Sequence, residues 1–131
     1  VALDKSGNIT AGTSTGGMMN KKCNRIGDVP VVGAGTYANN KTCGVSATGW
    51  GEFFIRNVVA YDISAMMEYQ NKTLEEAAKI SIFDKVGKMG ATGGVIGIDK
   101  NGSVMMEFNS PGMYRGYKTE NSDYIIKMFK N

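Results

Sequence analysis

The chain of 131 residues contains no histidine. Without this side chain it cannot supply the base of a Ser-His-Asp or Cys-His arrangement, and the commonest protein ligand of first-row metals is also missing. Any hydrolysis that the protein supports must therefore take its base from another kind of group.

Cysteine is scarce as well, since only Cys23 and Cys43 are present. Two cysteines are too few for a disulfide framework, and without histidine or a CxxC spacing they form no predicted metal site. We expect both to be reduced thiols, which favours a reducing compartment and a cytoplasmic location.

Long apolar runs are absent too, because stretches such as residues 95–98 are far shorter than the roughly 20 residues of a bilayer span. The N-terminus has no basic region followed by an apolar one, so no targeting segment is predicted. Lysine and arginine (15) exceed aspartate and glutamate (12) by only 3 and are scattered along the chain. These patterns argue against membrane and nucleic-acid partners, and the length predicts one domain, or a portion of one, over residues 1–131.

Hairpins are predicted near both ends of the chain. A Ser-Gly-Asn cluster separates the β-compatible residues 1–4 from residues 9–13. The turn residues 99–102 separate residues 95–98 from residues 103–108 in the same way. The chain therefore carries two antiparallel strand pairs.

Two helices are predicted between these hairpins. Apolar residues recur at helical spacing over residues 52–69, and a capping box at residues 73–76 begins a second helix that should stop near Gly87 or Gly90. With a last strand at residues 124–129, the order predicts an α+β fold in which helices are layered on an antiparallel sheet.

Glycine is concentrated before the first predicted helix. A flexible linker would be rich in serine and poor in apolar residues, but apolar residues interrupt this stretch at residues 29–32 and 36–38. We therefore expect the backbone to approach a ligand closely here. The glycines concerned are Gly16, Gly17, Gly27, Gly33, Gly35, Gly44, Gly49 and Gly51.

Arg25 and Asp28 lie three residues apart in this stretch. A guanidinium binds a carboxylate through two hydrogen bonds, and a carboxylate accepts from an ammonium, so the pair suits the two charged groups of a free amino acid. The alternative is an ordinary salt bridge within a loop, which is common and contributes little.

Two threonines are candidates for catalytic roles. Thr48 and the amide of Gly49 lie at the start of the first predicted helix, where they could bind a developing oxyanion, unless Thr48 merely caps the helix. Thr15 follows a predicted strand and could point into a site, although threonine is common in strands. Trp50, between two glycines, could be a pocket wall or a surface aromatic.

Four segments together carry a family resemblance. They are Thr-Ser-Thr-Gly-Gly at residues 13–17, the stretch 24–40 that begins Asn-Arg-Ile-Gly-Asp, Ser-Ala-Thr-Gly-Trp-Gly-Glu at residues 46–52, and Phe-Asn-Ser-Pro-Gly-Met-Tyr-Arg at residues 108–115. In this order they resemble the β subunit of plant-type L-asparaginase, also called isoaspartyl aminopeptidase. Members of that family are N-terminal nucleophile hydrolases, whose precursor cleaves itself to create the N-terminal threonine that attacks the substrate.

The resemblance implies a role for each matching residue. Thr15 would orient and polarise the nucleophile, Thr48 and Gly49 would form the oxyanion hole, and Arg25 would bind the substrate α-carboxylate. The α-ammonium would be bound by Asp28 with the carbonyl of Gly51. The substrates would be L-asparagine and β-aspartyl dipeptides, with no cofactor and no metal, and the α-amine of the nucleophile would act as the base.

The resemblance also implies an assembly. The chain would form half of a four-layer αββα sandwich, completed by an α chain from the same precursor, and two such αβ heterodimers would pair. The family's β subunit begins Thr-Val-Gly-x-Val-Ala, whereas this chain begins Val1-Ala2-Leu3, so the nucleophilic threonine is expected four residues upstream of Val1. Two other functions remain open for this chain: it could belong to a glycosylasparaginase, or to an inactive homologue that binds amino acids or a partner protein.

Overall fold

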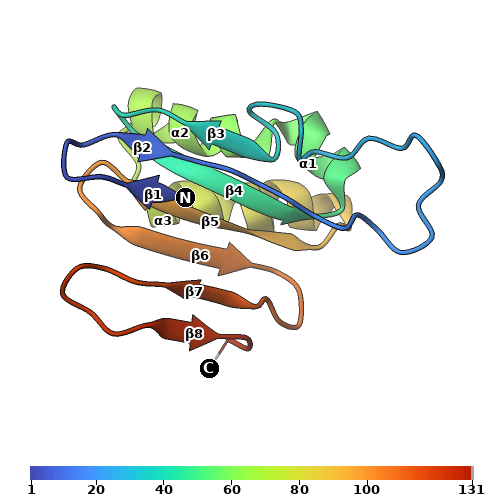
Figure 1. Ribbon diagram of the computed structural model, residues 1–131. Helices are drawn as coiled ribbons and strands as arrows, with labels where there is room; N and C mark the ends of the chain where they lie inside the picture. The colour runs from blue at the N-terminus through green and yellow to red at the C-terminus, as the bar shows by residue number, and fades with distance from the viewer. Residues whose placement is uncertain (131) are drawn as a thin grey trace.

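The computed structural model describes residues 1–130 and has a four-stranded antiparallel sheet at its centre (Figure 1). The strands stand in the order β3-β4-β5-β6. The pairing of β4 with β5 extends from Cys43 opposite Asp99 to Gly49 opposite Gly93. The bounds are Thr36–Ala38 for β3, Cys43–Gly49 for β4, Gly93–Asp99 for β5 and Val104–Phe108 for β6.

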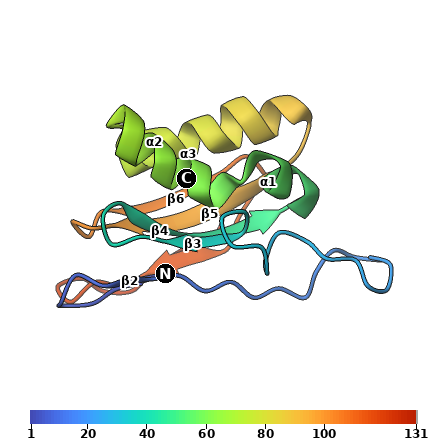
Figure 2. The same cartoon turned by 90° about the horizontal axis from the view of Figure 1, so that it is seen from above.

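Helices cover one face of this sheet, as Figure 2 shows. They are α1 (Gly51–Asn57), α2 (Val59–Gln70) and α3 (Leu74–Lys79), which continues into a π-helical segment, η1 (Ile80–Val86), and a 3-10 turn, η2 (Gly87–Met89). The predicted packing of helices against an antiparallel sheet is confirmed. The fully buried core between the two layers consists of Cys43, Val45, Phe54, Val59, Ala60, Ile63, Ala77, Ala78, Ile82, Val86 and Val95.

Two short ribbons complete the chain. Strands β1 (Ala2–Leu3) and β2 (Ile9–Thr10) form the predicted first hairpin, with shorter strands than expected, on the sheet face opposite the helices (Figure 2). The predicted hairpin of β5 and β6 is confirmed as well. The predicted last strand is β8 (Ile125–Lys127), and its partner β7 (Arg115–Tyr117) was not predicted.

Strands β3 and β4 were also missed by the sequence analysis, which treated this part of the chain only as a glycine-rich stretch. Strand β4 has the sequence Cys-Gly-Val-Ser-Ala-Thr-Gly, with few of the β-branched and aromatic residues typical of strands. Its small residues suit a strand covered on both faces. A Cβ added at Gly44 would lie 2.6 Å from Cγ2 of Ile9, because β2 crosses the sheet at that point.

The first predicted helix is divided in two at Val58. This residue is in the left-handed conformation, with a φ of 48°, which is unusual for a β-branched side chain. The break lets the first turn of α2 bond to a loop, since the amides of Ala60 and Tyr61 donate to the carbonyls of Ala34 and Gly33 at 3.1 and 2.8 Å. Tertiary hydrogen bonds therefore override the helical periodicity here.

The second predicted helix begins as expected. Thr73 and Glu76 form the capping box, with the side chain of each accepting from the backbone amide of the other. The helical segment ends at Gly90, whose φ is 82°, as predicted for one of the two glycines considered. None of the helices in residues 1–130 is both long and apolar enough to cross a membrane.

Candidate functional site

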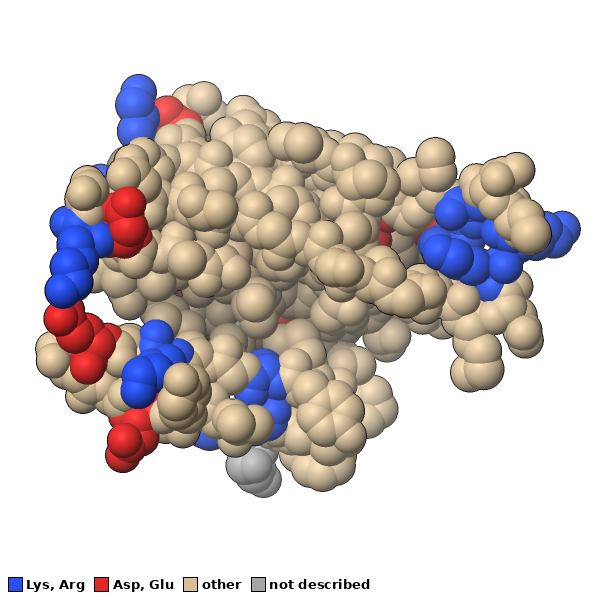
Figure 3. All heavy atoms as spheres, in the orientation of Figure 1, with Lys and Arg blue, Asp and Glu red and all other residues tan. Residues whose placement is uncertain are grey.

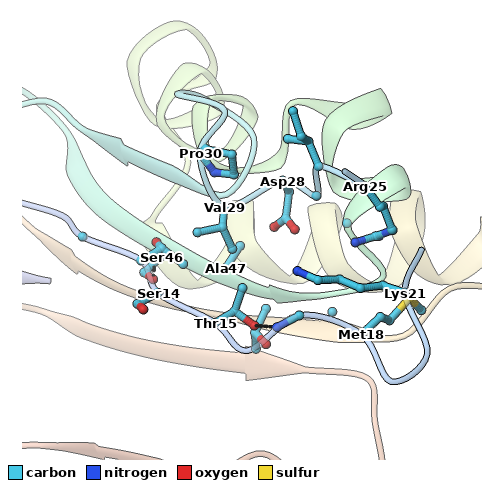
Figure 4. A pocket seen from close by; sticks show the side chains of 18 of the residues that line it. Ser14, Thr15, Met18, Lys21, Arg25, Asp28, Val29, Pro30, Ser46 and Ala47 are labelled. Atoms are coloured by element: carbon cyan, nitrogen blue, oxygen red, sulfur yellow. Dashed lines mark hydrogen bonds between the residues drawn. The ribbon is translucent and has the colours of Figure 1, made fainter. Parts of the chain in front are cut away.

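A pocket of about 720 Å³ opens on the sheet face opposite the helices, where β4 ends and α1 begins. All six residues singled out from the sequence line it: Thr15, Arg25, Asp28, Thr48, Gly49 and Gly51. Thr15, Arg25 and Asp28 come from the loop between β2 and β3, which lies over the end of β4 in Figure 4. Thr48 and Gly49 end β4, and Gly51 begins α1. The structure therefore brings together residues that are up to 36 positions apart in the sequence.

Thr48 and Gly49 are placed by strand pairing with β5. A Cβ added at Gly49 would lie 2.7 Å from Cα of Gly93 and 2.8 Å from the ring of Phe54, and the φ of Gly49 is +148°. Any other residue at this position would be both strained and crowded. Thr48 does not cap α1, because the N-cap is Trp50 and no side chain caps this helix. The capping alternative for Thr48 is therefore wrong.

Asp28 is the most deeply buried charged group of the pocket, with 4% of its surface exposed. Its Oδ2 has no hydrogen-bond partner among residues 1–130. Burial raises the pKa of Asp28 above its ordinary value of 3.8, although its own backbone amide and the nearby Arg25 act in the opposite direction. A cation bound in the pocket would supply the missing partner.

Gly51 is in contact with this carboxylate. A Cβ added at Gly51 would lie 2.6 Å from Oδ1 of Asp28 and 2.9 Å from its backbone nitrogen. Alanine at this position would have to displace Asp28, because these atoms are closer than real Cβ contacts allow. The absence of a side chain at Gly51 thus leaves room for the carboxylate at this position.

Arg25 forms an ion pair, but its partner is Glu52 and not Asp28. Its Nε donates to Oε1 of Glu52 at 2.8 Å, and its Nη2 lies 2.6 Å from the same oxygen. The alternative of a salt bridge between Arg25 and Asp28 is therefore not what the structure contains. Sequence reasoning missed Glu52 because 27 residues separate it from Arg25.

Thr15 lies at the open side of the pocket. Its hydroxyl accepts a hydrogen bond from the amide of Gly17 at 3.0 Å, which leaves its proton available to another group. The chain before it is anchored to the sheet, since the hydroxyl of Thr13 lies 2.7 Å from that of Ser46 and donates to the carbonyl of Gly35.

Lys21 lines the pocket but was not selected by the sequence analysis. Figure 4 shows its side chain extending into the pocket toward Asp28. Figure 3 shows basic side chains gathered over the protruding loop at this end of the molecule, which carries Lys21, Lys22 and Arg25. The Lys-Lys pair was visible in the sequence, but its place beside the pocket depends on how the loop folds.

Trp50 and the cysteines lie outside this pocket. Trp50 is 46% exposed and packs against Phe53, with ring centroids 6.1 Å apart, so it is a surface aromatic. Cys23 and Cys43 are free thiols, and burial raises the pKa of Cys43 to about 11. A thiol with such a pKa is protonated at neutral pH and is a poor nucleophile.

The segment at residues 108–115, which contributed to the family resemblance, lies on the other side of Thr48 and Gly49. Ser110, Gly112 and Met113 line a smaller hollow there, of about 370 Å³, together with Thr48 and Gly49. The side chain of Asn109 holds this region in place, because it accepts from the amide of Gly93 at 2.8 Å and donates to the carbonyl of Ala91 at 2.9 Å.

Comparison with known proteins agrees with the resemblance. The family described as asparaginase matches residues 1–126. The chain is 52% identical over 117 residues to proteins named isoaspartyl peptidase from Salmonella typhimurium and Escherichia coli, which covers 89% of this chain and 37% and 36% of those proteins. It is 43% identical over 110 residues to an isoaspartyl peptidase/L-asparaginase from Danio rerio, covering 84% of this chain and 35% of that protein. The chain thus spans a little over a third of the length of these relatives.

Proposed function

Because this chain belongs to the asparaginase family, we propose that it forms part of an enzyme that hydrolyses L-asparagine and β-aspartyl dipeptides. The observation that carries this proposal is the pocket in which Arg25 lies beside the buried Asp28 carboxylate, whose Oδ2 lacks a hydrogen-bond partner in residues 1–130. A guanidinium and a buried carboxylate in one pocket complement the α-carboxylate and α-ammonium of an amino acid.

The substrate would be held by its α-substituents. Arg25 would bind the α-carboxylate, while Asp28 and the carbonyl of Gly51 would accept from the α-ammonium. An ammonium would also compensate the buried charge of Asp28, since a cation beside a buried carboxylate favours its ionised form. These contacts would leave the side-chain amide of asparagine, or the isopeptide bond of a β-aspartyl dipeptide, near Thr48 and Gly49.

The nucleophile in this proposal is a threonine four residues upstream of Val1. The side chain of Val1 lies over Gly44, and β1 leaves the N-terminus in the direction opposite to β4 (Figure 1). Four preceding residues in extended conformation would span about 13 Å, the same length of strand that separates Gly44 from Thr48. A segment continuing the line of β1 would therefore end beside Thr48 and Thr15.

The reaction would proceed through an acyl-enzyme. The threonine hydroxyl would attack the amide carbon, giving its proton to its own α-amine, whose ordinary pKa of about 8 suits this transfer. Thr48 and the amide of Gly49 would donate to the oxyanion, and Thr15 would donate to the nucleophile. Ammonia or the amine of the leaving residue would take the proton and depart, and water would then hydrolyse the threonyl ester.

A partner chain would cover the pocket face. Residues of β5 and β6 on this face, such as Ile96, Ile98 and Met106, remain partly exposed. We propose that an α chain from the same precursor packs here to complete a four-layer αββα sandwich, that two αβ heterodimers pair, and that the enzyme is cytoplasmic.

The test uses the complete gene product, assayed for ammonia release from L-asparagine and for cleavage of a β-aspartyl dipeptide. Arg25→Ala should lose about 2–4 kcal/mol of substrate binding, seen mainly as a raised KM, because a charged hydrogen-bonding partner is removed. The control is Arg56→Ala, since Arg56 packs over Phe53 on the surface of α1, away from the pocket. Native kinetics in a folded Arg25→Ala protein would overturn the assignment. If the protein binds L-aspartate but hydrolyses neither L-asparagine nor the β-aspartyl dipeptide, it is the inactive homologue that binds amino acids.

A further inference from the structure

Glu52 is a second carboxylate near the site, paired with the pocket residue Arg25, that no part of the proposed mechanism uses. It is the second residue of α1 and follows Gly51 directly. Its Oε1 accepts from Nε of Arg25 at 2.8 Å and lies 2.6 Å from Nη2 of the same guanidinium. The side chain of Glu52 is 53% exposed, whereas that of Arg25 is 21% exposed.

These contacts occupy one edge of the guanidinium and leave another free. A guanidinium has a side edge formed by Nε and Nη2 and an end edge formed by Nη1 and Nη2, and each can bind two oxygens. Glu52 takes the side edge, so the end edge remains available to a ligand. A Cβ added at Gly27 would lie 3.2 Å from Nη1, and the glycine therefore keeps this end uncrowded.

The two partners differ in how firmly the backbone holds them. Arg25 belongs to the loop before β3, which has no helix or strand, whereas Glu52 is anchored in the first turn of a helix. An arginine on a loop samples many side-chain conformations unless its guanidinium is bound. The pKa of Glu52 is lowered by a hydrogen bond from the backbone amide of Glu52 and by Arg25, so the carboxylate stays ionised at neutral pH.

We propose that Glu52 is a positioning residue, which holds the guanidinium of Arg25 by its side edge so that the end edge faces the substrate α-carboxylate. This inference rests on the proposed function. Glu52 does not touch the substrate and acts only through Arg25. An exposed ion pair contributes little to stability, so the effect of Glu52 lies in the orientation of Arg25.

The test compares Glu52→Ala and Glu52→Gln in the complete gene product, with L-asparagine as substrate. Glu52→Ala should raise KM about 10-fold and leave kcat within about 2-fold, because the freed guanidinium must be ordered by the substrate itself. Glu52→Gln should stay within about 3-fold of the native KM, since its single carbonyl oxygen can accept from Nε and lie beside Nη2 as Oε1 does now. If Glu52 acted only through its negative charge, Glu52→Gln would raise KM as much as Glu52→Ala does.

A double variant shows whether Glu52 acts through Arg25. In Arg25→Ala/Glu52→Ala, kcat/KM should equal that of Arg25→Ala alone, whereas independent roles would add. The matched control is Glu75→Ala, because Glu75 is likewise the second residue of a helix, 63% exposed and paired with a single cation, Lys79. It should keep native kinetics.

The outcomes separate the two proposals. If the native protein hydrolyses L-asparagine and Glu52→Ala has a native KM, or the double variant is additive, the positioning role of Glu52 is overturned alone. If the native protein hydrolyses neither L-asparagine nor β-aspartyl dipeptides, the proposed function fails and this inference fails with it.

Discussion

The two faces of the four-stranded sheet differ in what covers them. On the helix face, the β4 residues Cys43, Val45 and Ala47 are at most 3% exposed and belong to the core. On the opposite face, Ser46 and Thr48 of the same strand line the pocket. Because side chains alternate along a strand, one segment of seven residues supplies both the core and the site.

Because of this difference, we expect residues on the helix face to determine stability and residues on the pocket face to determine substrate binding. Removing apolar volume from the helix face should lower the protein's free energy of unfolding, because the side chains there are closely packed. The pocket face holds an incompletely bonded carboxylate and two glycines, Gly49 and Gly51, at which a side chain would collide with the surrounding protein. Substitutions on the two faces should therefore change different measured quantities, and the following variants of the complete gene product test this.

Ile63→Ala should have the largest effect on stability. Ile63 lies on α2 and is fully buried, so truncation should lower the free energy of unfolding by about 2–5 kcal/mol, while Ile63→Val should lower it by about 0.5–1.5 kcal/mol. Denaturant titration measures both values. The KM for asparagine, measured well below the melting temperature, should stay within about 2-fold of native. A large change in KM would show that the two faces are coupled.

Thr48→Val should affect turnover and spare stability. Thr48 is exposed near the end of β4, and valine keeps its shape, so the melting temperature should barely change. If the hydroxyl donates to the oxyanion, kcat should fall about 100-fold or more, which is roughly 2.7 kcal/mol, with a nearly native KM. Thr10→Val, at an exposed position of β2, is the control. A loss of stability with native kcat would refute the catalytic role.

Asp28→Asn should weaken binding without lowering stability at neutral pH. The folded pKa of Asp28 is raised, so its ionised form costs stability once the pH exceeds that pKa, and the cost vanishes below the unfolded value of 3.8. The asparagine variant should thus melt at the native temperature or above it at pH 7, and the difference should disappear near pH 3. Its KM should rise about 10- to 100-fold, because a charged hydrogen bond to the α-ammonium is lost.

The same group predicts the pH dependence of the native enzyme. Substrate binding needs the Asp28 carboxylate in its ionised form, so KM should rise as the pH falls through the raised pKa. This acid limb should be absent from the Asp28→Asn variant. An identical limb in both proteins would mean that another group controls binding.

Lys88→Ala should have the smallest effect. Its ion pair with Asp84, at 3.1 Å, lies on the surface of the helical layer, and the two side chains are 73% and 58% exposed. Such pairs contribute about 0–1 kcal/mol, so the melting temperature should hardly move. A change as large as that of Ile63→Val would show that the surface of the helical layer contributes to stability as much as its buried side does.

The helices and outer hairpins could be predicted because their signals are local. The capping box at Thr73 and Glu76 and the glycine that ends the helical segment depend on neighbouring residues only. Strand β4 could not be predicted, because its small residues are explained by what packs on them, such as Ile9 over Gly44. The break at Val58 likewise depends on the distant carbonyls of Gly33 and Ala34.

The sequence by itself determined which residues are candidates for the site and which catalytic mechanisms are excluded by the lack of histidine. With no histidine and with four family segments in order, it singled out Thr15, Arg25, Asp28 and the residues at the end of β4. Only the tertiary structure decided that these residues share one pocket, that Arg25 pairs with Glu52, and that Asp28 is buried with an unbonded oxygen. The physical reason is that residue types and short spacings are local, whereas burial, hydrogen-bond partners and charge environment arise from segments that meet only when the chain folds.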